Sequence, residues 1–131
     1  NYFVIDDSCY FVDLPGYGYA KVSQQEKERW AKLMESYFAA GRIDLGVMIV
    51  DARHAPTQND IVMANWFIES GCSFVVVANK LDKLKKSELI PNMERIRDVL
   101  NLPEDCTVIP FSAEKGTGRE ELVKIILSAV K

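Results

Sequence analysis

Four consecutive residues, Asn79-Lys80-Leu81-Asp82, directly follow an apolar run at 74–78, and their side chains suit the recognition of a purine base. A carboxylate accepts two hydrogen bonds at once, so Asp82 can take the N1 and N2 hydrogens of guanine, a pair that adenine does not present. Asn79 can brace the purine edge, and the aliphatic stem of Lys80 can lie along the base plane. A charged loop after a strand is the alternative, but the string predicts a site that selects guanine over other bases.

An earlier string, Asp13-Leu14-Pro15-Gly16, ends another apolar run and places a carboxylate and a backbone N–H at one edge. Asp13 is predicted to hold magnesium through water, because hard cations prefer oxygen ligands. The Gly16 N–H can approach a γ-phosphate, since no Cβ intervenes. Taken alone, the string is more often an Asp at a strand end before a Pro-Gly turn.

A third string, Phe111-Ser112-Ala113, stands at the end of the last apolar run of the chain. The Ala113 backbone N–H is a candidate donor to guanine O6, and a surface loop of small residues is the alternative. Open α/β folds bind their ligands at the carboxyl ends of their strands. Three strings in this order, each at a predicted strand end, are therefore far more specific for a guanine nucleotide than any one of them.

No stretch of the chain reads G-x-x-x-x-G-K-[ST], the loop whose backbone N–H groups and Lys hold phosphates. The nearest candidate, Gly41 followed by Gly46, fails at Val47. The sequence is therefore interpreted as the later part of a GTP-binding domain, truncated before its first residue. We expect the 131-residue chain alone not to hydrolyse GTP, and the sequence identifies no catalytic group.

The composition is that of one globular domain over residues 1–131, with 48% hydrophobic and 27% charged residues. A formal charge of -3 argues against binding nucleic acid through the net field of the protein. Three scattered cysteines indicate neither a disulfide framework nor a zinc site, which favours reduced thiols and a cytoplasmic location. No apolar run approaches the roughly 18 residues that span a bilayer, so no membrane partner is expected.

Short apolar runs alternate with amphipathic segments, which predicts an α/β fold with a mostly parallel sheet covered on both faces. The runs at 2–5 and 9–12 predict an antiparallel hairpin at its edge. Further strands are expected at 45–50, 73–78 and 107–111, and helices at 23–41, 57–71, 87–100 and 117–129. Pro91 predicts that regular helix in the third of these begins only there. The inward faces are expected to comprise Ile61, Ala64, Asn65 and Ile68, then Met93, Ile96, Val99 and Leu100, then Leu122, Ile125, Ile126 and Ala129.

The string V-D-L-P-G-Y-G-Y-A at 12–20, with the segments 50–57, 79–83 and 111–118, resembles the EngB-type bacterial ribosome-biogenesis GTPases over nearly the whole chain. The resemblance implies a three-layer Ras-like P-loop NTPase fold that here lacks its first strand, P-loop and first helix. It also implies GTP and GDP as ligands, Mg2+ as the metal, and a cytoplasmic role in large ribosomal subunit assembly and cell division. Tyr17 stands where Ras-like hydrolases carry a Gln that orients water, which implies slow turnover.

Two functional classes fit these observations. One is a GTPase switch whose partner, by the resemblance, is the large ribosomal subunit or its assembly intermediate. The other is a guanine-recognising or protein-contact module that has lost phosphate chemistry, which explains the missing loop without truncation. Because a central strand is missing from the expected sheet, we expect the chain to self-associate, exchange strands with a second copy, or close up into an altered sheet.

Overall fold

The computed structural model describes residues 2–5, 9–12 and 44–129, together with single positions 25, 28, 29, 32, 35 and 36. Its elements in chain order are β1 (Tyr2–Ile5), β2 (Cys9–Val12), β3 (Gly46–Asp51), α2 (Gln58–Ser70), β4 (Phe74–Asn79), the 3-10 turn η1 (Leu81–Lys83), α3 (Lys86–Leu100), β5 (Val108–Pro110) and α4 (Arg119–Ala129). The predicted Asp13–Gly16 string lies outside the described residues. The single positions fall within the helix predicted at 23–41, and they are helical and exposed.

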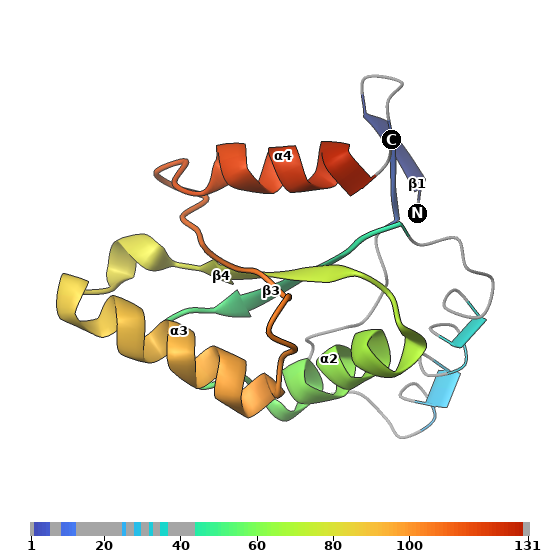
Figure 1. Cartoon of the computed structure of the whole chain (residues 1–131), viewed down its shortest axis with the longest axis horizontal. Coiled ribbons are helices and arrows are strands. Elements are labelled where there is room, and N and C mark those ends of the chain that lie inside the picture. The colour runs from blue at the N-terminus through green and yellow to red at the C-terminus, as the bar shows by residue number, and fades with distance from the viewer. Residues whose placement is uncertain are drawn as a thin grey trace.

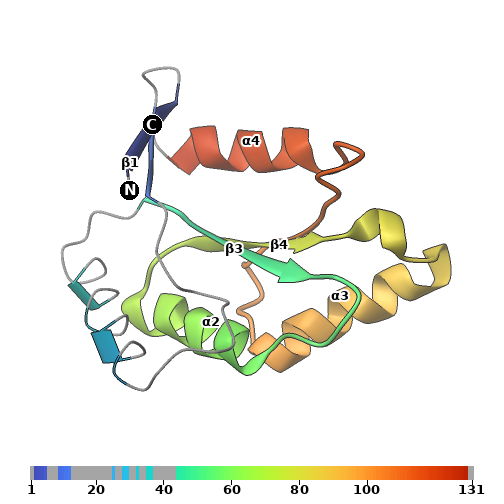
Figure 2. The ribbon, with the colours of Figure 1, turned by 180° about the vertical axis from the view of Figure 1, so that it is seen from behind.

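Figure 1 shows three layers, with α4 on one side of a central sheet and α2 and α3 on the other. The sheet contains three parallel strands in the order β3-β4-β5. In the reverse view of Figure 2, β3 is the strand nearest the viewer. It lies at one edge of the three-stranded sheet. The α/β class and the parallel sheet are as predicted, and each strand lies within one residue of its predicted position at either end.

One side of the sheet, called the closed face below, packs tightly against α2 and α3. Met48 and Val50 of β3 and Val76 and Ala78 of β4 point to this side, and none is more than 4% exposed. The helices and the loop before β5 contribute Met63, Ala64, Phe67, Ile96, Leu100 and Cys106 to the same core. Alternate residues of a strand point to opposite faces, so half of each apolar run forms this core.

The first residue of β3 must be small because an aromatic ring lies against it. A Cβ at Gly46 would overlap the ring of Phe67. That ring also stacks on Phe74 at the start of β4, with ring centroids 5.0 Å apart. The Gly46 N–H donates to the Ser73 carbonyl at 2.8 Å, so the backbone of β3 is fixed at this point.

The opposite side, called the open face below, is only partly covered. Val75 and Val77 of β4 and Ile109 of β5 are buried there, whereas Val47 and Ile49 of β3 are 40% and 59% exposed. Helix α4 lies on this side, yet none of its residues is buried. The stripe expected to be buried in α4 is half-buried instead, and Val47 and Ile49 on the same side of the sheet are exposed as well.

The predicted hairpin is present, with Tyr2 opposite Val12 and Ile5 opposite Cys9. It forms a two-stranded sheet of its own and pairs with no described strand of the parallel sheet. The outer edge of β3 therefore has no partner among the described strands.

Helix α2 begins and ends where local signals predicted. The Thr57 hydroxyl accepts a hydrogen bond from the Asp60 N–H, the Asp60 carboxylate accepts one from the Thr57 N–H, and Gly71 ends the helix with a φ of 73°. The predicted inward face was partly wrong, since Asn65 is exposed and Met63 and Phe67 are buried. The helix is rotated so that its larger apolar side chains meet β3.

Helix α3 begins at Lys86, so the prediction that regular helix starts at Pro91 was wrong. The Glu88 carboxylate accepts a hydrogen bond from the Lys85 N–H at 2.9 Å, which starts the helix upstream. Helix α3 continues through Pro91, although proline lacks one N–H donor of the helix and its ring crowds the carbonyl four residues before it. Val99 is 36% exposed and not inward, whereas Ile96 and Leu100 are buried as expected.

Candidate nucleotide-binding site

The carboxyl ends of β4 and β5 bring together two of the three predicted strings. Asn79 is the last residue of β4, and Leu81 and Asp82 lie in η1 immediately after it. Between them Lys80 has a left-handed φ of 76°, which turns the chain from strand to η1 within one residue. The Leu81 N–H donates to the Phe111 carbonyl at 3.0 Å and so ties the two strings to each other.

The Asp82 carboxylate is held from two sides. The hydroxyl of the buried Ser112 donates to Asp82 Oδ1 at 2.8 Å. The ammonium of Lys83 lies 3.7 Å from Asp82 Oδ2. The Asp82 side chain is 10% exposed, and these two contacts hold its orientation.

The hydrogen bond from Ser112 lowers the pKa of Asp82 below its ordinary value, and this outweighs the opposing effect of burial. The charge of Lys83 lowers that pKa further. Asp82 is therefore a carboxylate at neutral pH, and a carboxylate oxygen that already accepts one hydrogen bond still has a free lone pair. The group is chemically suited to accept a pair of N–H donors from a base edge.

The second contact between the strings joins the two groups predicted to meet the purine edge. The Ala113 N–H donates to Asn79 Oδ1 at 3.2 Å. In this structure the predicted donor to guanine O6 therefore has an internal acceptor. A base that binds here must share this N–H with Asn79 or take it over. The contact spans 34 residues, so no local sequence pattern indicates it.

The loop after Ser112 is held in one shape by its own backbone. The Lys115 N–H donates to the Ser112 hydroxyl at 3.1 Å, and the Gly116 N–H donates to the Ser112 carbonyl at 2.8 Å. Gly116 and Gly118 have φ values of 77° and 82°, which favour glycine. A Cβ at Gly118 would also collide with the Pro110 carbonyl. Ser112 thus orients both this loop and Asp82.

A neighbouring ion pair was not among the predicted site residues. Asp51, the last residue of β3, lies opposite Asn79 in the sheet. Arg53 donates through Nε to Asp51 Oδ1 at 3.0 Å and through Nη2 to Asp51 Oδ2 at 2.8 Å. These hydrogen bonds lower the pKa of Asp51 to about 2 against the effect of burial. Its position at a third strand end was the sequence signal that could have identified it.

The remaining predicted site residues, Asp13, Leu14, Pro15 and Gly16, lie outside the described part of the chain. Within the described part, no group of three or more His, Cys, Asp or Glu side chains is arranged to hold a metal ion. No helix among the described residues is long and apolar enough to cross a membrane. The described site is therefore the part predicted to meet the base.

Several curated proteins of similar sequence carry the name probable GTP-binding protein EngB. The chain is 40% identical over 132 residues to the probable GTP-binding protein EngB of Clostridium kluyveri, covering 99% of this chain and 66% of that protein. It is 46% identical over 125 residues to the probable GTP-binding protein EngB of Clostridium beijerinckii, covering 94% of this chain and 63% of that protein. The chain belongs to the EngB family of GTP-binding proteins. It spans less than two thirds of the length of these EngB proteins.

The family model described as "Ferrous iron transport protein B" also matches, over residues 2–126. Among solved structures, a crystal structure of a probable GTP-binding protein EngB is similar with a TM-score of 0.76 and 23% identity, over 92% of this chain and 76% of that one. The apo form of translation elongation factor SelB from Methanococcus maripaludis is similar with a TM-score of 0.69 and 24% identity, over 91% of this chain and 24% of that one. At these identities the structural matches show the fold alone, and that fold is the Ras-like α/β domain of EngB.

Proposed function

We propose that this EngB-family chain recognises the guanine base of GTP and GDP, and that the protein acts as a slow GTPase switch. The observation that carries the proposal is the Asp82 carboxylate, oriented by the buried Ser112 hydroxyl at 2.8 Å and ionised at neutral pH. The relatives support the proposal, because they are named as probable GTP-binding proteins.

The geometry supports one arrangement of the base. Asp82 accepts the N1 and N2 hydrogens of guanine, and the Ala113 N–H donates to O6 beside Asn79. The exposed Lys80 lays its stem along the ring, and Phe111 holds the loop through its carbonyl. Adenine presents no matching pair of donors, so the Asp82 carboxylate and the Ala113 N–H would lack partners if adenine bound. Unpaired polar groups reduce the binding free energy, so adenine should bind more weakly.

The phosphates and the metal are proposed to meet residues 13–16. Asp13 would hold Mg2+ through water, and the Gly16 N–H would approach the γ-phosphate. Magnesium, when bound, neutralises charge on the phosphates. Leu14 and Pro15 would shape the turn between these two groups.

We further propose, from the resemblance of the string at 12–20, that the protein acts in the cytoplasm in large ribosomal subunit assembly and cell division. Its partner would be the large subunit or an assembly intermediate. We also propose that the 131-residue chain self-associates or exchanges strands. The outer edge of β3 has no partner among the described strands, and Ile49 of this strand is 59% exposed. Sedimentation velocity would detect this, and a monomer at all concentrations would contradict it.

A second candidate function is a guanine-recognising module without phosphate chemistry. The observation that favours it is that the groups brought together in the described site are those predicted to meet the base. Phosphate release from GTP can exclude this second candidate. Magnesium-dependent release by the purified 131-residue chain, free of contaminating GTPases, would exclude the second candidate and would also contradict the expectation that this chain alone is inactive.

Base selectivity tests the leading proposal. We expect the chain to bind GDP in preference to ADP, measured by NMR titration, which also reports weak affinities. Asp82→Asn should weaken GDP binding about 100-fold or more and favour xanthosine diphosphate, whose edge is complementary to an amide. Asp98→Asn, an exposed change on α3, is the matched control and should bind GDP like the unmodified chain. Equal binding of GDP and ADP by the unmodified chain would refute the proposal.

A further inference from the structure

Hydrogen bonds link α3 to the proposed base site across the ends of all three parallel strands. Asn92 of α3 donates through Nδ2 to the Ala52 carbonyl at 3.0 Å. The Ala52 N–H donates to the Asn79 carbonyl at 2.8 Å, and Asn79 Oδ1 accepts from the Ala113 N–H at 3.2 Å. We call this series the strand-end ladder. It begins on a helix that supplies no predicted site residue.

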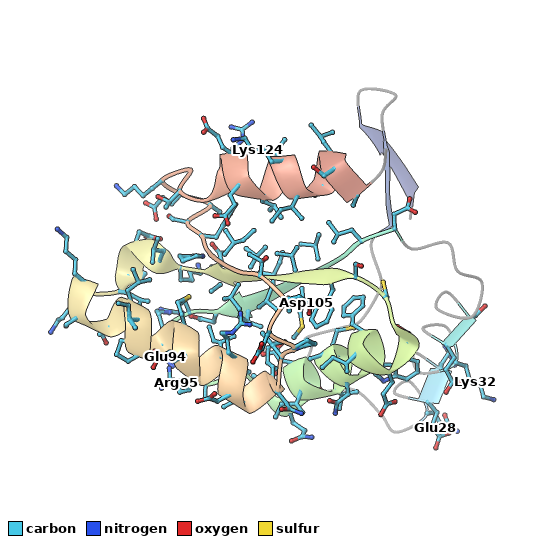
Figure 3. All side chains as sticks on the ribbon, in the orientation of Figure 1. Glu28, Lys32, Glu94, Arg95, Asp105 and Lys124 are labelled. Atoms are coloured by element: carbon cyan, nitrogen blue, oxygen red, sulfur yellow. The ribbon has the colours of Figure 1, made fainter. Side chains whose placement is uncertain are left out.

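The loop after β3 is the first rung of the ladder, and α3 holds it at two consecutive carbonyls. Beside the bond from Asn92 to Ala52, Arg95 donates through Nη2 to the Arg53 carbonyl at 3.3 Å. Asn92 and Arg95 are three residues apart on one side of α3, and Figure 3 marks Arg95 on that helix. Ala52 is fully buried, so its carbonyl needs a partner within the protein.

We propose that Asn92 is a positioning residue for the guanine site, acting through Ala52 and Asn79 on the Ala113 N–H. The proposal rests on the proposed function, in which this N–H meets guanine O6. Asn92 itself need not touch the nucleotide. Its contribution is to fix the loop after β3, against which the end of β4 is hydrogen-bonded.

The ladder reaches only one side of the base site, the Ala113 N–H held by Asn79, which makes the proposal specific. Asp82 is oriented by Ser112, and Ser112 takes no part in the ladder. Loss of Asn92 should therefore disturb the O6 side and leave the Asp82 side intact. A general loss of stability would weaken both sides together.

Nucleotide analogues separate the two sides. Inosine diphosphate lacks the amino group that Asp82 is proposed to read and keeps O6. The diphosphate of 6-thioguanosine keeps the N1 hydrogen and the amino group and carries sulfur, a weaker acceptor, in place of O6. Asn92→Ala should weaken GDP binding about two- to tenfold, the range for one hydrogen bond. It should leave the preference for GDP over inosine diphosphate unchanged and reduce the preference for GDP over the 6-thioguanine nucleotide.

Amide hydrogen exchange of the unliganded chain tests the ladder without any nucleotide. We expect faster exchange at Ala113 in Asn92→Ala and in the isosteric Asn92→Asp, which has no Nδ2 donor. Glu94→Ala, an exposed change on the same helix, is the matched control and should leave both exchange and binding as they were. A double-mutant cycle with Asn79→Ala should show that the two changes are not additive.

The proposal is overturned if Ala113 exchanges at the same rate with and without Asn92. It is also overturned if both nucleotide preferences fall together with the melting temperature, since that is the signature of a merely structural role. If the unmodified chain binds GDP no better than ADP, the proposed function fails instead, and the exchange measurement still decides whether the ladder exists.

Discussion

The two faces of the parallel sheet differ in how completely they are covered, although the same strands supply both. On the closed face Met48 and Val50 of β3 are no more than 4% exposed, and on the open face Val47 and Ile49 of the same strand are 40% and 59% exposed. The residues alternate along one strand, so the difference does not come from local structure. It comes from what each face packs against.

The comparison shows which parts of the sheet are stabilised most by burial. Burial of an aliphatic side chain stabilises a protein by about 1.5–3 kcal/mol relative to leaving it exposed. The closed face gains this at nearly every inward position of β3 and β4. On the open face only β4 and β5 gain it, because α4 buries none of its own residues. The base site lies at the ends of β4 and β5, which are the better packed strands.

The largest expected effect is a difference in stability between alanine variants of two isoleucines, one on each face of the sheet. Ile96 is fully buried against the closed face, so Ile96→Ala should lower the free energy of unfolding by about 2–5 kcal/mol through lost burial and a residual cavity. Ile49→Ala on the open face should cost less than about 1 kcal/mol. Urea denaturation of both variants measures the difference. Equal losses would show that the open face is covered in solution and would break the comparison.

A smaller effect is expected where β3 meets α2 on the closed face. Gly46→Ala places a methyl group in the ring of Phe67 and should cost about 1–3 kcal/mol as the ring is displaced. A second change, Phe67→Leu, makes room and should recover part of that loss in the double variant. Denaturant midpoints of the two single variants and the double variant measure this. Gly46→Ala with unchanged stability would show that the closed face packs more loosely than described.

Local signals predicted the elements of this fold well, and long-range ones were missed. The cap formed by Thr57 and Asp60 and the glycine at Gly71 predicted both ends of α2 correctly, because both signals act within one turn of the helix. The inward side of α2 was partly wrong because rotation of a helix depends on its neighbours. The exposure of Ile49 could not be predicted from the sequence either. An apolar run predicts a strand, but it does not indicate whether both faces of that strand are buried.

The candidate site shows the same division. The sequence predicted Asn79, Asp82, Ser112 and Ala113 from their order after strands, and the structure places them together, although their contact with a nucleotide remains a prediction. Asn92 was missed because its partner at Ala52 lies 40 residues away. A polar residue within an amphipathic helix carries no local sign of such a contact.

The smallest expected effect concerns the end of β3, where charge supplements the incomplete packing of the open face. Arg53 lowers the pKa of Asp51 from 3.8 to about 2, so the folded protein favours the carboxylate more than the unfolded chain does. The resulting stabilisation is present above about pH 4 and is lost as the pH falls toward 2. Because Asp51 is 36% exposed, solvent screening keeps it under about 1 kcal/mol.

Asp51→Asn removes this titration and serves to measure it. The difference in unfolding free energy between the unmodified chain and Asp51→Asn should be largest near neutral pH and shrink between about pH 4 and pH 2. Other carboxylates titrate in both proteins and cancel in the difference. A difference that stays constant across that range would show that Arg53 does not hold Asp51 in solution. The end of β3 would then depend on its backbone bonds to Asn79 and on Asn92, and Asn92→Ala should be equally damaging with and without Asp51→Asn.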